Sequence, residues 1–112
     1  MPLSAADLVA LAERINLGLQ DGHRGRMDVL DAATALLLMV GHIARTLDEG
    51  SPVEGHCDNL RQTREHLDAA LTLLRGIEIV AQTAPQDDLD RILQEASDRS
   101  AAAGRRLLGQ GA

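Results

Sequence analysis

A seven-residue repeat of aliphatic side chains constrains the fold of this chain more than any other feature of its sequence. The repeat consists of Leu60, Leu67, Leu74 and Ala81. Side chains at this interval lie along one face of an α-helix, and such repeats line the seams between packed helices. Three further residues share that face: Thr63, Ala70 and Ile77. The segment therefore predicts a long helix that packs against other helices.

Helical periodicity is present in four segments, and no segment sustains the two-residue alternation of a half-buried strand. The sequence therefore predicts an all-α fold, with helices over about 4–20, 26–48, 52–82 and 85–108. Its 112 residues fit one domain, 1–112, and the simplest architecture is an antiparallel up-and-down four-helix bundle. In that bundle we expect the second and third helices to form a long central hairpin.

Capping residues indicate where the expected helices begin. Ser4 and Asp7 have the spacing of a capping motif at the start of the first helix. Ser51, Pro52 and Glu54 together provide an N-cap, a proline at the first helical position and a capping-box glutamate. We therefore expect the third helix to begin almost directly after the second.

Composition excludes several classes of function. The chain has no Phe, Tyr or Trp, so it has no aromatic platform on which bases could stack. All eleven basic residues are arginines, interleaved with acidic residues in a chain of net charge -6, which is unlike a nucleic-acid-binding surface. The absence of lysine excludes Schiff-base and P-loop mechanisms. We expect no nucleic-acid partner.

The sequence also predicts a cytoplasmic protein. Its single cysteine, Cys57, cannot form an intramolecular disulfide. The first twelve residues contain Asp7 and lack the basic region of a signal peptide. The longest uncharged run, 32–44, is too short to cross a bilayer. We therefore expect no membrane partner.

The second expected helix is apolar on two sides. Nine residues already supply one core-facing side: Val29, Leu30, Ala33, Leu36, Leu37, Val40, Ile43, Ala44 and Leu47. The other side carries a second set of apolar or small residues: Ala32, Ala35, Leu38, Met39 and Gly41. His42 and Thr46 lie on the same side. Either the remainder of the bundle or a second copy of the chain must cover this second side, because exposing it would create an apolar patch.

We predict a homodimer in which two copies of the second helix pack together. The predicted interface residues are Ala35, Leu38, Met39, Gly41 and His42. The small residues among them permit close approach of the two helices. The alternative, a fully enclosed second helix, places Leu38 and Met39 in the monomer core.

His42 has three interpretations. The first is a neutral imidazole at the rim of an interface. The second is a phosphoacceptor, because His42 with Arg45 one turn later resembles the active histidine of histidine phosphotransfer domains. The family has a Lys-Gly pair after its histidine, whereas here Arg45 is followed by Thr46 and the glycine, Gly41, precedes the histidine. The third interpretation is a metal ligand.

The candidate metal ligands are His42, His56, Cys57 and His66, and an inward-facing Glu78 is a further candidate for a site. His56 and Cys57 are adjacent and so point about 100° apart on a helix. The chain has no C-x-x-C, H-x-x-x-H or E-x-x-H pattern. The alternative is a solvent-exposed helix start whose one cysteine has no functional role. We predict no cofactor.

No catalytic constellation is evident. A nucleophile elbow is absent, and the helical positions of Ser97 and Ser100 are predicted to lie at the surface. The leading hypothesis is therefore a non-enzymatic, regulatory, protein-binding module that pairs with itself and with another helical protein. The alternatives are a metal- or ligand-binding helical bundle and histidine phosphotransfer on His42.

Overall fold

The computed structural model describes residues 5–20, 26–50 and 58–110, and these residues form four helices and no strand. The helices are α1 (Ala5–Gln20), α2 (Arg26–Gly50), α3 (Asp58–Val80) and α4 (Gln86–Gln110). The predicted all-α fold is therefore confirmed. The caps expected at Ser4, Ser51, Pro52 and Glu54 lie outside the described residues.

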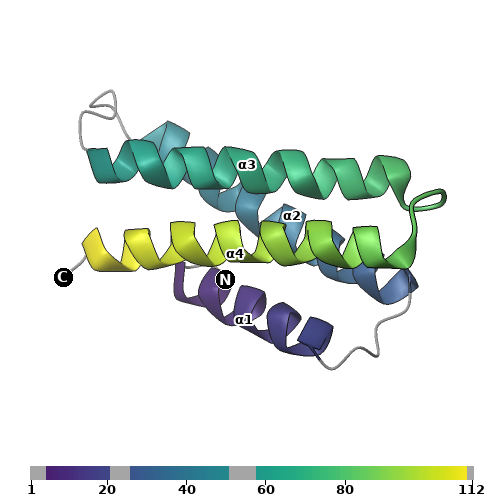
Figure 1. Cartoon of the computed structure of the whole chain (residues 1–112). Helices are drawn as coiled ribbons and strands as arrows, with labels where there is room; N and C mark the ends of the chain where they lie inside the picture. Colours follow the sequence, from purple (N-terminus) through teal and green to yellow (C-terminus); the bar gives the residue numbers. More distant parts are fainter. Residues whose placement is uncertain (1–4, 21–25, 51–57, 111–112) are drawn as a thin grey trace.

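Helix α4 is the centre of the structure. It contacts α1, α2 and α3, and its contacts with α3 and α1 are the most extensive between any two helices. Figure 1 shows α4 between α3 and α1, with α2 crossing behind. Within the described residues α1 and α3 do not touch. Helix α2 also contacts all three other helices, but less extensively than α4 does. The central hairpin of the second and third helices stays a prediction, since the most extensive contacts are those of α4.

Small residues allow α4 to occupy this position. Its buried positions include six of them: Ala96, Ser97, Ser100, Ala101, Ala103 and Gly104. Small side chains let neighbouring helix backbones approach closely, so three helices can pack around one. Ser97 and Ser100 are both fully buried, and their predicted surface position is wrong. The buried face of α4 is wider than a single apolar stripe because helices cover it from several directions.

The core is aliphatic throughout the described residues, as the absence of aromatic rings requires. The predicted α3 face is confirmed, because its members from Thr63 to Ala81 are buried and Leu60 is half-buried. All nine residues predicted for the inner side of α2 are buried or pack against the core. The inner faces of α2 and α3 therefore follow the periodicity of the sequence.

Polar contacts join helices at the edge of this core. Arg105 donates a hydrogen bond to Glu13 Oε1 at 2.8 Å, which links α4 to α1. Arg64 Nη1 donates to the carbonyl oxygen of Ala44 at 3.0 Å, which links α3 to α2. The second contact joins α3 to the C-terminal half of α2.

By length and composition, α2 is the one helix of the described chain that could cross a membrane, over the 21 residues Met27–Leu47. The uncharged run 32–44 is shorter because Asp31 precedes it and Arg45 follows it, whereas Met27–Leu47 includes both charged residues and Asp28. Core helices of water-soluble proteins also meet this criterion. Here the inner face of the segment belongs to the hydrophobic core of the bundle.

Candidate interaction surface on α2

The outer face of α2 carries the candidate surface, which we define as Asp31, Thr34, Ala35, Leu38, Gly41, His42 and Arg45. All of these are exposed except Gly41, which is half-buried. Leu38 is 69% exposed, although the other leucines of α2 belong to the core or pack against it. Leu38 is thus the one large aliphatic side chain of the candidate surface, and the other exposed large hydrophobic residue of α2, Met27, lies at the N-terminal end of the helix.

Two residues assigned to this outer side by the sequence contact the core. Ala32 is buried in the core cluster, and Met39 is half-buried and packs against it. Met39, like Gly41, is only partly accessible, and its place in the predicted interface stays a prediction. Helix α2 contacts α1, α3 and α4, so the core covers more of its circumference than one helical stripe. Ala35, Leu38 and His42 are the exposed members of the predicted set.

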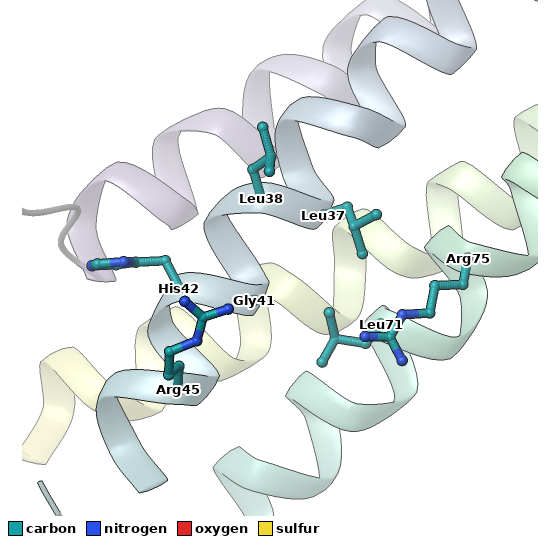
Figure 2. Close-up of a pocket in the computed structure, with 7 residues that line it drawn as sticks. All are labelled: Leu37, Leu38, Gly41, His42, Arg45, Leu71 and Arg75. Atoms are coloured by element: carbon teal, nitrogen blue, oxygen red, sulfur yellow. The ribbon is translucent and has the colours of Figure 1, made fainter. Parts of the chain in front are cut away.

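A surface hollow of about 460 Å³ lies between α2 and α3, beside Leu38 (Figure 2). Helix α2 contributes Leu37, Leu38, Gly41, His42 and Arg45. Helix α3 contributes Leu71 and Arg75. Leu37 and Leu71 are half-buried, whereas both arginines are exposed. The hollow therefore combines an aliphatic floor with a cationic rim.

Charge is distributed unevenly along the candidate surface. Arg45 and Arg75 bring two positive charges to one hollow of a chain whose net charge is -6. Asp31 lies two turns before Leu38 on the same face. Within the described part of the chain, neither Asp31 nor Arg45 takes part in an ion pair or a side-chain hydrogen bond. Both charges are therefore available to a partner.

His42 is exposed, and Figure 2 shows its ring extending away from Leu71 and Arg75. Its carbonyl oxygen accepts a hydrogen bond from Thr46 Oγ1 at 2.9 Å. The ring has no described partner and lies on the same helix face as Arg45. An exposed ring in this position can contact a partner protein or accept a modification.

His66 occupies a different part of the molecule, on α3 opposite α4. Arg99 Nη1 lies 3.4 Å from His66 Nδ1, a geometry in which the guanidinium donates to a neutral imidazole. Burial lowers the pKa of His66, and the positive charges of Arg99 and Arg106 lower it further, against an opposing effect of Glu65. This environment favours the neutral ring and holds two cations nearby.

The metal-ligand candidates do not converge in the described residues. His42 lies on the outer face of α2, His66 lies beside Arg99, and Glu78 is exposed rather than inward-facing. No group of three or more His, Cys, Asp or Glu side chains in the described ranges is placed to hold a metal ion. His56 and Cys57 lie outside those ranges.

Neither the hollow nor the position of Arg75 in it follows from the sequence. Leu71 and Arg75 are one helical turn apart on α3, which is an ordinary pattern for a helix that faces solvent at its edge. Only the packing of α3 against α2 places this pair beside Arg45. The sequence contains no signal for that inter-helix register.

Comparison of the chain with protein-family models, with curated proteins and with solved structures found no significant match in any of the three.

Proposed function

We propose that this chain is a non-enzymatic, cytoplasmic protein-interaction module that forms a homodimer through the outer face of α2. The observation that carries the proposal is the 69% exposure of Leu38 at the centre of that face. Burying a leucine side chain stabilises a complex by about 1.5–3 kcal/mol, and a symmetric interface buries two copies. Regulation of another helical protein by the same kind of packing is part of the proposal.

Two neighbours of Leu38 support a helix as the partner. Ala35 is small, and a Cβ atom added to Gly41 would meet nothing within 4 Å. The surface around Leu38 is therefore low enough for another helix to approach closely. The hollow beside it adds aliphatic contact area from Leu37 and Leu71.

The proposal includes an antiparallel up-and-down arrangement of the four helices. Each helix contacts its successor, and α1 also contacts α4, as expected when helices alternate in direction around a bundle. The connection between α3 and α4 comprises only residues 81–85, which supports antiparallel neighbours.

Replacement of Leu38 by glutamate tests the proposed interface. The variant should be monomeric at concentrations at which the wild-type chain is dimeric in sedimentation velocity experiments, because a buried carboxylate at the centre of an interface is unfavourable. Ile79→Glu is the matched control, since Ile79 is 82% exposed on α3 and is outside the candidate surface. Its dimer should persist. Dissociation by both substitutions, or by neither, would contradict the proposed interface.

A second candidate function is phosphotransfer on His42. The observation in its favour is that His42 is exposed and lies on the same helix face as Arg45, whose positive charge would stabilise a phosphorylated ring. Incubation with a phosphodonor and a response regulator should then give acid-labile phosphate on the wild-type chain and none on His42→Gln. Absence of label from both proteins would contradict this candidate.

A further inference from the structure

The candidate surface is self-complementary in one orientation. We propose that its partner is a second copy of this chain, with the two α2 helices antiparallel, Leu38 at the two-fold axis, and Asp31 of each copy opposite Arg45 of the partner subunit. This inference rests on the proposed homodimer and specifies its geometry. It adds two ion pairs and a register that the exposure of Leu38 alone does not define.

The spacing of three residues defines the register. Asp31, Leu38 and Arg45 are seven residues apart, so at 100° per residue they lie within about 20° of one line along the helix. A rise of about 1.5 Å per residue places Asp31 about 10 Å before Leu38 along the helix axis and Arg45 about 10 Å after it. A two-fold axis at Leu38 therefore exchanges the two positions and brings opposite charges together.

The same charges disfavour a parallel pair. With both helices running in one direction and in register, Asp31 would face Asp31 and Arg45 would face Arg45. Like charges at an interface are destabilising, whereas the antiparallel pair replaces both repulsions with attractions. Both residues are exposed and make no ion pair among the described residues, so pairing with a partner disrupts no existing contact of either side chain.

Small residues fit the same register. On one flank of the stripe, Gly41 lies opposite Thr34 of the partner subunit, and on the other flank Ala35 lies opposite His42 of the partner subunit. Each of these pairs contains one residue with little or no side chain. The space that is open above Gly41 can therefore receive the threonine without displacing either helix.

The hollow between α2 and α3 lies beside the proposed ion pair. Gly41 and Arg45 line it from α2, and Arg75 lines it from α3. In this register Asp31 of the partner subunit meets Arg45 at the rim of the hollow, whose other cation, Arg75, lies on α3.

Reciprocal charge reversal tests the register. Asp31→Arg and Arg45→Asp each place two like-charge pairs in the dimer, because the symmetry repeats every contact. Each single variant should therefore have a dimer dissociation constant at least about tenfold higher than the wild type. An equimolar mixture of the two variants should restore association as a heterodimer, since every pair across that interface is again of opposite charge. The double variant should restore the homodimer.

Glu95→Arg is the control for a change of net charge, because it alters charge by the same amount as Asp31→Arg at an exposed position of α4, outside the candidate surface and the hollow. It should dimerise as the wild type does. Circular dichroism should show native helicity for every variant, since all the substituted side chains are exposed.

The outcomes separate this inference from the function on which it rests. Rescue in the mixture and in the double variant supports the antiparallel register. A wild-type dimer that is insensitive to both reversals, or single variants that are not rescued by mixing, would overturn the register and leave a homodimer of another geometry. A wild-type chain that is monomeric throughout would overturn the proposed homodimer as well.

Discussion

Gly104 of α4 lies so close to Val9 of α1 that a Cβ atom added to the glycine would sit 2.6 Å from Val9 Cγ2 and 3.0 Å from the carbonyl oxygen of Ala5. The two helices therefore approach closely because one contact residue has no side chain. This contact is part of the extensive packing of α1 against α4.

Gly104→Ala should reduce the free energy of unfolding by about 1 kcal/mol, because the overpacking at Val9 and Ala5 exceeds the gain in helix propensity. Gly76→Ala is the matched control, since a Cβ atom there would meet nothing within 4 Å. That substitution should raise the free energy of unfolding by about 0.5–1 kcal/mol. Urea denaturation followed by circular dichroism measures both. Equal stabilisation by the two alanines would contradict the close contact of α1 with α4.

The periodicity of the sequence predicted the inner faces of α2 and α3, because a residue's place on a helix depends on spacing alone. It did not predict the burial of Ser97 and Ser100, since their side chains are polar and their burial depends on how many helices surround α4. Ala32, assigned to the outer side of α2, is buried in the core for the same reason. Arg75 joins Arg45 at one hollow only through the packing of α3 against α2.

Ser97→Ala should yield a more stable protein than Ser100→Ala, by about 1 kcal/mol. Ser97 Oγ is buried without a hydrogen-bond partner among the described residues, so its removal eliminates an uncompensated desolvation cost. Ser100 Oγ donates to the carbonyl oxygen of Ala96 at 2.7 Å, and its removal loses that bond. Chemical denaturation of the two variants gives the comparison. The reverse order of stability would show that the Ser97 hydroxyl is satisfied.

Stability should decrease as the pH falls from neutral, with a contribution from His66. The pKa of His66 is lowered in the folded protein, so the unfolded chain, with a histidine pKa of about 6.5, binds the proton more readily. The loss of stability due to His66 begins as the pH falls to about 6.5, and it stops growing once the pH is below the folded-state pKa of His66. His66→Gln should remove this part of the pH dependence in denaturation curves between about pH 7 and 5. An unchanged pH profile would contradict the neutral, Arg99-paired imidazole.

A cysteine at position 38 should cross-link the dimer. In a Cys57→Ser background, Leu38→Cys places two thiols at the proposed two-fold axis, where mild oxidation should form an intersubunit disulfide. Non-reducing gel electrophoresis then shows a band at twice the monomer mass. Ile79→Cys in the same background is the control, because Ile79 is an exposed residue of α3 outside the candidate surface. Equal cross-linking of the two variants would indicate random collision instead of a defined pair.

The most direct test of the homodimer is light scattering coupled to size exclusion, applied to the wild-type chain over a range of concentrations. An interface formed by one helix face buries an area at the small end of the range for specific complexes, so we expect a weak dimer. The predicted mass therefore rises with concentration from 12.0 kDa toward twice that value. A mass that stays at 12.0 kDa up to about 1 mM, the concentration at which even a weak millimolar complex is half formed, would contradict self-association through α2.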